Sequence, residues 1–183
     1  MTTYGGACCG TVFKIEMNGA KTVLYNFMGG EDGGYPSGGL LRDSTGNLYG
    51  TTQYGGKLGC NAPVGCGTVF QLHTDGTLKT LYRFSGPEGL SPNAGLIRDP
   101  GGNLYGTTLL GGTIPCGDGR GCGTVFKLDR NGVETVLYRF TGMGDGKYPV
   151  TALTRDTAGV LYGTTTEGGA SDCDCGVVFK ITP

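Results

Sequence analysis

Two short segments, Leu-Tyr-Gly-Thr-Thr at 104–108 and Gly-Thr-Val-Phe at 123–126, decide the fold because each recurs along the chain. The first is repeated at 48–52 and 161–165, and the second at 10–13 and 67–70, with the variant Gly-Val-Val-Phe at 176–179. Successive copies of the second segment are 57, 56 and 53 residues apart. A period of this length is typical of repeat folds, in which each unit buries its faces against its neighbours.

The middle repeat predicts four short strands, which we name a to d in chain order. They are expected at Ala94–Asp99, Leu104–Thr108, Gly123–Leu128 and Val133–Phe140. Turn residues at 100–103 separate strands a and b, a long loop rich in glycine and cysteine leads to strand c, and an Asn-Gly pair marks the turn before strand d. Alternation places Thr124, Phe126 and Leu128 on one face of strand c.

We therefore predict a single all-β domain over residues 1–183, built from tandem four-stranded antiparallel repeats like the blades of a β-propeller. The repeat units are approximately 2–50, 51–106, 107–163 and a partial unit at 164–183. About four blades result, of which the first lacks strand a and the last lacks strand d. Such a chain closes into a compact four-bladed propeller or forms an open arc completed by another copy. A β-solenoid or a stack of hairpins is the alternative architecture.

Composition excludes several classes of protein. The chain has 14 Lys and Arg against 15 Asp and Glu, without the basic excess that a general nucleic-acid binder needs. No apolar run approaches the roughly 20 residues of a membrane span. The 39 glycines disfavour helices throughout, and no segment has helical periodicity.

The motif string resembles the tandem Gloeobacter/Verrucomicrobia repeat, and more loosely the opening of NHL-type propeller blades. It runs Leu-Tyr-Gly-Thr-Thr-x-x-Gly-Gly, Gly-Thr-Val-Phe-Lys, Asn-Gly, Leu-Tyr-x-Phe, Asp-Gly-x-x-Pro and Gly-Leu-x-x-Asp-x-x-Gly-Asn. The resemblance implies a bacterial, extracellular or cell-surface repeat protein of propeller type, in a family whose members often carry cell-surface sorting signals. It brings no catalytic residues.

Eight cysteines fall into four close pairs, which indicates an oxidising compartment. The pairs are Cys8/Cys9, Cys60/Cys66, Cys116/Cys122 and Cys173/Cys175. The two inner pairs have equal spacing in equivalent b–c loops, and we expect each to form a loop-closing disulfide. Because local bonds within the two terminal pairs would be strained, we expect these pairs to bond with each other, within one chain or between copies. A four-thiolate zinc site is the alternative. The N-terminus has no signal peptide, so we expect a mature form or part of a longer precursor.

An arginine and a tyrosine recur in every repeat and are candidate ligand-binding residues. They are Arg42, Arg98 and Arg155 in strand a, and Tyr49, Tyr105 and Tyr162 in strand b. If strand a is innermost, the arginines could line a channel and hold an anion or a sugar carboxylate, and the tyrosines could stack on a glycan. The favoured interpretation is structural: a ladder of ion pairs and hydrogen bonds with Asp43, Asp99 and Asp156, and tyrosines packed in the core.

The remaining candidate sites are weak. Acidic residues recur in the d–a loops, at 31–32, 88 and 145, and could hold calcium, but turn formation explains them without an ion. The only histidine, His73, lies in a predicted turn, which leaves almost no material for a Ser-His-Asp triad or a His-rich metal centre. We therefore predict no catalytic residues, no metal site and no cofactor.

Three functions follow, in order of preference. The first is a non-catalytic, secreted or cell-surface protein with a structural, self-assembling or adhesive role, which forms homo-oligomers or head-to-tail filaments through open terminal blades. The second is a propeller module that binds a glycan or a small ligand. The third is a metal-dependent propeller lyase or lactonase, which the scarcity of histidine disfavours.

Overall fold

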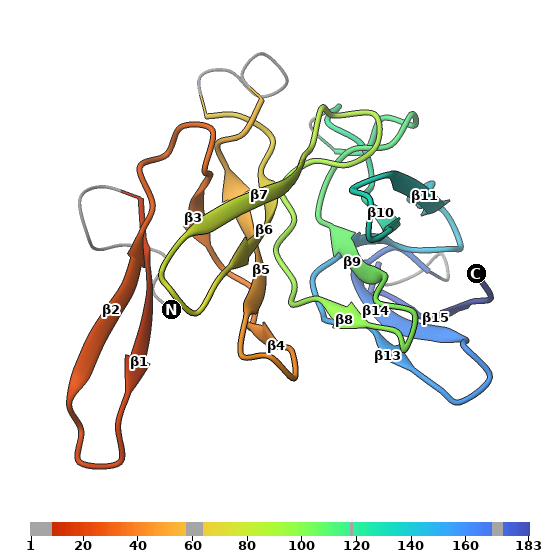
Figure 1. Ribbon diagram of the computed structural model, residues 1–183. Coiled ribbons are helices and arrows are strands. Elements are labelled where there is room, and N and C mark those ends of the chain that lie inside the picture. The colour runs from red at the N-terminus through yellow and green to blue at the C-terminus, as the bar shows by residue number, and fades with distance from the viewer. Residues whose placement is uncertain (1–8, 58–63, 118, 170–173) are drawn as a thin grey trace.

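The computed structural model describes residues 9–57, 64–117, 119–169 and 174–183, and these residues form fifteen β-strands (Figure 1). No helix long and apolar enough to cross a membrane occurs among them. Hydrogen bonding groups these strands into four antiparallel sheets. The prediction of an all-β repeat fold is confirmed.

Each sheet is one blade, and the blades follow one another along the chain. The first blade contains β1 (Thr11–Ile15) and β2 (Lys21–Asn26). The second contains β3 (Gly34–Pro36), β4 (Leu41–Arg42), β5 (Leu48–Tyr54), β6 (Thr68–Leu72) and β7 (Leu78–Arg83). The third contains β8 (Ile97–Arg98), β9 (Leu104–Thr108), β10 (Thr124–Leu128) and β11 (Glu134–Arg139). The fourth contains β12 (Lys147–Pro149), β13 (Thr154–Arg155), β14 (Leu161–Glu167) and β15 (Val178–Ile181).

Strand a is shorter than predicted. Only Ile97 and Arg98 of the expected Ala94–Asp99 segment pair with strand b. The carbonyl of Ala94 instead accepts a hydrogen bond from the Thr51 hydroxyl of the preceding blade, at 3.1 Å. In the second and fourth blades a further short strand, β3 or β12, pairs with the far end of strand b. The start of strand a is therefore used for contacts between blades.

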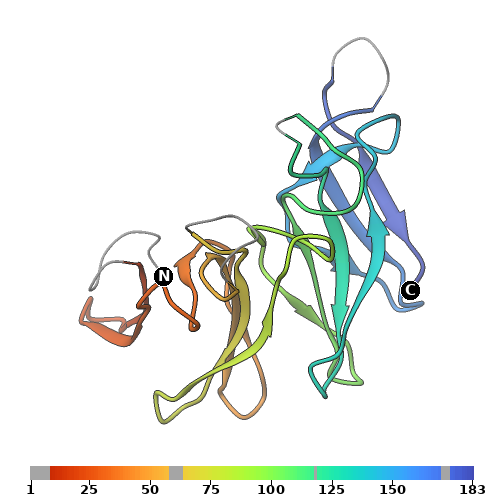
Figure 2. The same cartoon turned by 90° about the horizontal axis from the view of Figure 1, so that it is seen from above.

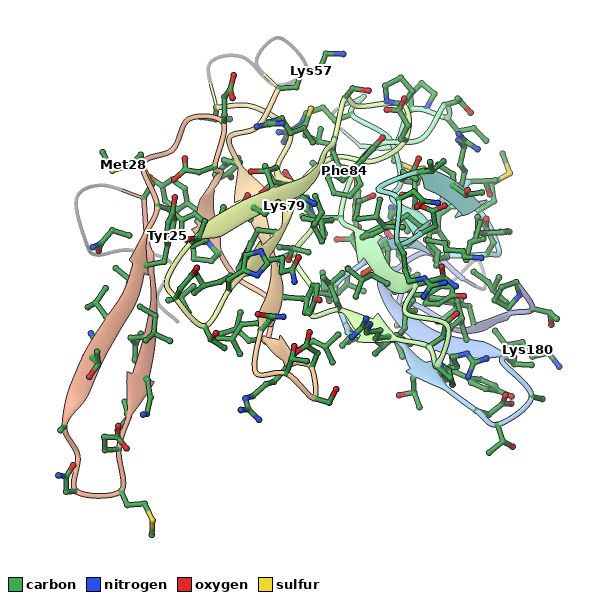
Figure 3. All side chains as sticks on the ribbon, in the orientation of Figure 1. Tyr25, Met28, Lys57, Lys79, Phe84 and Lys180 are labelled. Atoms are coloured by element: carbon green, nitrogen blue, oxygen red, sulfur yellow. A yellow bond between two sulfur atoms is a disulfide. The ribbon has the colours of Figure 1, made fainter. Side chains whose placement is uncertain are left out.

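The four blades form an open arc. The first and last blades lie at opposite ends of the molecule in both views (Figures 1 and 2). Met28 on the first blade and Lys180 on the last mark these two ends (Figure 3). Of the two arrangements that the sequence allows, the described residues therefore form the arc, not a closed four-bladed ring.

The hydrophobic core lies between the blades and forms three clusters, one for each pair of neighbours. Val12 and Phe27 of the first blade pack with Phe70 and Leu72 of the second. Equivalent residues fill the next two interfaces. Strand c is therefore buried on both faces: Val125 is as fully buried as Phe126, although alternation predicts only one buried face. This double burial follows because a blade inside the arc has a neighbour on each side.

A pair of phenylalanine rings joins each blade to the next. The ring that follows strand d packs edge-on against the ring in strand c of the following blade, with centroids 5.0–5.2 Å apart. The pairs are Phe27–Phe70, Phe84–Phe126 and Phe140–Phe179. Edge-on aromatic pairs contribute about 0.5–1.5 kcal/mol beyond their buried area.

The glycine of Leu-Tyr-Gly-Thr-Thr makes room for this phenylalanine. A Cβ atom on Gly106 would lie 2.7 Å from Cζ of Phe126 and 2.9 Å from Cδ2 of Leu96. Gly50 and Gly163 have the same relationship to the rings of their own blades. The repeated glycine is therefore required by packing.

Candidate functional site

An aspartate and a tyrosine fix the a–b turn of the second, third and fourth blades. The Asp43 carboxylate accepts hydrogen bonds from the side chains of Thr45 and Asn47, and from the Tyr49 hydroxyl at 3.1 Å. Burial alone would raise the pKa of Asp43, but these bonds together lower it. The tyrosine contact recurs in the next blades as Tyr105 to Asp99 at 3.0 Å and Tyr162 to Asp156 at 2.9 Å.

The strand a arginines interact across blades. The Arg98 guanidinium lies 3.9 Å from the carboxylate of Asp43 in the preceding blade and 5.6 Å from the centre of the Tyr49 ring. In the next interface the charge of Arg155 helps to lower the pKa of Asp99. The ladder that the sequence predicts within each turn therefore extends from blade to blade, because the partner of Arg98 is not its neighbour Asp99.

The repeated tyrosines lie mostly in the core. Tyr49 and Tyr105 are buried, whereas Tyr162, in the last blade, is exposed. Burial is the largest cause that raises the pKa of Tyr49, followed by its hydrogen bond to Asp43. A buried ring cannot serve as a stacking platform for a sugar, so Tyr49 and Tyr105 do not fit that role.

A groove of about 290 Å³ lies between the second and third blades. The second blade contributes Tyr49, Gln71, Lys79 and Leu81, and the third contributes Arg98, Gly102, Leu104, Asp129, Arg130, Asn131 and Gly132. Arg98 and Tyr49, which the sequence singles out, thus line one cavity, whereas Arg42, Arg155, Tyr105 and Tyr162 do not line it. This groove is the candidate functional site.

The groove carries an excess of positive charge. Lys79 and Arg130 are exposed, and neither is in an ion pair with another described residue. Lys79 lies on β7, at the edge of the second blade (Figure 3). Asp129 is the only acid among the described residues that line the groove. It is held in the c–d turn by bonds from the backbone amides of Val133 and Asn131, which lower its pKa.

Lys79 and Arg130 do not appear among the candidates that the sequence identifies. Their signal is a departure from the repeat. The position of Lys79 is Thr22 in the first blade and Thr135 in the third, and that of Arg130 is Met17 in the first and Thr74 in the second. Lys79 and Arg130 are 51 positions apart in the chain and come together only when it folds, so their meeting in one groove is visible only in the structure.

One predicted disulfide, Cys116–Cys122, is confirmed. It closes the b–c loop of the third blade, and Cys122 is fully buried. Cys9, Cys66 and Cys175 are also disulfide-bonded. Cys8, Cys60 and Cys173 lie outside the described residues, so the pairing of the terminal cysteines stays a prediction.

The acidic d–a loops are held by their own hydrogen bonds. Asp32 accepts from the Tyr25 hydroxyl at 3.1 Å, Asp145 accepts from the Tyr138 hydroxyl at 2.9 Å, and Glu88 contacts Ser85. In the described part of the chain, no three His, Cys, Asp or Glu side chains are grouped as metal ligands. His73 lies in the c–d turn of the second blade, where its backbone amide bonds to the carbonyl of Thr77.

Solved propeller structures resemble this chain in fold but are considerably longer than it. A protein described as a gluconolactonase superposes with a TM-score of 0.50 at 19% identity, over 96% of this chain and 59% of its own. A luciferin-regenerating enzyme superposes with a TM-score of 0.58 at 15% identity, over 96% and 53%. A gluconolactonase from Xanthomonas campestris superposes with a TM-score of 0.53 at 17% identity, over 96% and 57%. The chain thus spans a little over half the length of these proteins, and at such identities the likeness shows the fold alone.

No curated protein matches the sequence. The family of the Gloeobacter/Verrucomicrobia repeat matches residues 1–183, in agreement with the resemblance carried by the repeated motifs. With the motifs, the blades and this match in agreement, the chain belongs to the Gloeobacter/Verrucomicrobia repeat family.

Proposed function

We propose that the protein is a non-catalytic, extracytoplasmic structural protein that assembles head to tail. The observation that carries the proposal concerns the outward faces of the first and last blades, which we call the end faces. The repeat equivalents of these two faces pack against each other wherever two blades meet inside the arc. A second copy is the natural occupant of each end face. A contact of this kind produces a ring or a filament, depending on the rotation between copies.

Strand c of an inner blade packs on two neighbours: one of its faces contacts the preceding blade and the other contacts the following blade. Its phenylalanine and the apolar residue two positions later face the preceding blade, where Phe70 and Leu72 are buried against the first blade. In the first blade these positions are Phe13 and Ile15, and Ile15 is 62% exposed. The first blade therefore presents the half that would receive a preceding blade.

The last blade presents the other half. Val178 is 80% exposed, whereas Val12, Val69 and Val125 at the same repeat position are fully buried. Among the described residues β15 pairs only with β14, whereas β1, β6 and β10 each pair with a strand d. An exposed apolar edge strand favours association with another β-sheet.

The chemistry of the loops supports the same proposal. The disulfide-bonded cysteines and the repeat family favour a location outside the cytoplasm.

Sedimentation of the purified chain at several concentrations tests the proposal. The wild type should form species larger than the 18.8 kDa monomer as its concentration rises. Val178→Asp and Ile15→Asp should each abolish assembly, because each places a charge in one half of the interface. The matched control is Val133→Asp, which alters an exposed valine in an inner blade and should assemble normally.

Mixing the two variants separates head-to-tail contact from other modes. Val178→Asp retains an intact first blade, and Ile15→Asp retains an intact last blade. An equimolar mixture should therefore give a one-to-one dimer and nothing larger. A wild type that stays monomeric at millimolar concentration, or variants that assemble like the wild type, would show that the proposal is wrong.

A further inference from the structure

We infer that the groove between the second and third blades binds a carboxylated saccharide. This site goes beyond the assembly proposed above, since its residues lie between two inner blades and away from both end faces. The groove volume of about 290 Å³ is near the lower end of the range for small-molecule sites, about 300–1,000 Å³. One or two sugar rings of a longer polymer would therefore occupy it.

The first argument is that its cations are not part of the repeat. A residue needed for folding recurs in every blade, as the strand a arginine does. At the position of Lys79 the first and third blades have Thr22 and Thr135, and at the position of Arg130 no other blade has a charged residue. Both cations line the same groove, Lys79 from the second blade and Arg130 from the third. Together with Arg98 they surround the cavity with three positive charges.

The second argument is that these charges are not balanced within the groove. Arg98 is partly offset by Asp43 at 3.9 Å. The carboxylate of Asp129 is occupied by the amides of its own turn. The charges of Lys79 and Arg130 remain, and an anionic ligand would offset them through charge-assisted hydrogen bonds.

The third argument distinguishes a carboxylate from a phosphate. Phosphate sites usually direct several backbone amides at the ligand. The amides of Gly102 and Gly132 instead bond to the carbonyls of Asp99 and Asp129, and that of Asn131 bonds to the Asp129 carboxylate. The turn amides are therefore used within the turns, and side chains supply the contacts to the ligand.

The fourth argument concerns the hydroxyl groups of a sugar. Gln71 donates from Nε2 to the Tyr49 hydroxyl at 3.0 Å, and Asn131 donates from Nδ2 to Asp129. Within the described residues neither of their amide carbonyl oxygens accepts a hydrogen bond. These two acceptors flank the cations and match the hydroxyls that neighbour the carboxylate of a uronic acid.

Calorimetric titration with trigalacturonate tests the inference, and trigalacturonate methyl ester and inorganic phosphate are the comparison probes. We expect saturable binding of the acid, and at least about tenfold weaker binding of the other two. The double variant Lys79→Thr/Arg130→Thr should weaken binding of the acid by at least about tenfold. Threonine is the residue of the first and third blades at the Lys79 position and of the second blade, as Thr74, at the Arg130 position. The fold should therefore be retained, which thermal unfolding would verify.

The control removes two charges elsewhere. The control variant is Lys127→Gln/Lys180→Gln. Each lysine becomes the residue that the second blade has at the equivalent position, Gln71, and neither lysine lines the groove. It should bind trigalacturonate within twofold of the wild type. Equal binding by the ester or by phosphate would overturn the carboxylated-saccharide assignment. Absence of binding, or equal losses in both double variants, would overturn the site itself.

Discussion

Phe84, at the end of the second blade, packs edge-on against Phe126 of the third, with ring centroids 5.1 Å apart and an angle of 71° between the ring planes. Both rings are fully buried. The same pair links the first blade to the second and the third to the last, so this one contact defines how the blades stack.

Removal of the Phe126 ring should be among the most costly changes to the fold. Phe126→Ala leaves a cavity between two blades and should lower the free energy of unfolding by about 3–5 kcal/mol. Phe13→Ala is the matched control, because Phe13 occupies the same repeat position but is only partly buried. The Lys21 ammonium nitrogen lies 4.5 Å from the centre of the Phe13 ring. It should cost about 1 kcal/mol. Urea unfolding followed by circular dichroism gives both values, and equal losses would contradict the stacking described here.

Addition of one methyl group at Gly106 should also destabilise the protein. In Gly106→Ala the new Cβ would overlap the ring of Phe126, and such overpacking costs about 1–3 kcal/mol. Gly144→Ala provides the contrast, since nothing lies within 4 Å of its Cβ position and its φ is not positive. That variant should be neutral or slightly stabilised. The comparison is made by thermal unfolding, and a neutral Gly106→Ala would show that the packing at this glycine is loose.

Glu134 should make the stability of the protein depend on pH. Burial and the nearby charge of Glu88 raise the pKa of Glu134 to about 7, although Arg139 opposes the shift. One carboxylate oxygen of Glu134 is buried and has no hydrogen-bond partner among the described residues. Because the pKa of Glu134 is raised in the folded state, its contribution to stability is present in full below the pKa of the unfolded state. That contribution is lost as the pH rises through about 7. Glu134→Gln should therefore stabilise the protein at pH 8 by about 1–2 kcal/mol, a range reduced for partial exposure, and leave it unchanged at pH 4. Urea titrations at both pH values measure this, and a difference independent of pH would contradict it.

The hydrogen bond between Tyr105 and Asp99 should stabilise the protein at neutral pH. Burial would raise the pKa of Asp99, but bonds from Asn103 and Tyr105, with the charge of Arg155, lower it. Tyr105→Phe should cost about 1 kcal/mol at pH 7. Because the folded-state pKa of Asp99 is lowered, this loss is full above about pH 4 and shrinks as the pH falls through the folded value.

The matched variant for this effect is Tyr162→Phe. Tyr162 makes the same bond to Asp156 at 2.9 Å but is exposed, so water replaces the lost contact. Its loss should stay below about 0.5 kcal/mol. Chemical unfolding from pH 3 to pH 8 measures both variants, and an equal cost would show that burial does not strengthen the bond.

Local elements of the fold were predictable because their causes are local. Strand b at Leu104–Thr108 lies where the sequence predicts it, and the turn residues and alternation also place strands c and d correctly to within one residue. The disulfide Cys116–Cys122 follows from spacing in one loop. Strand a was overestimated, since Ala94 bonds to a residue 43 positions earlier in the chain.

The sequence by itself determined the repeat and the strands within each blade, because period, turn chemistry and alternation act over a few residues. The tertiary structure decided that Arg98 meets Asp43, that Lys79 and Arg130 share a groove, and that Val178 is exposed where Val125 is buried. These relationships join residues of different blades. They depend on how one sheet is placed against the next, which no local pattern of residues fixes.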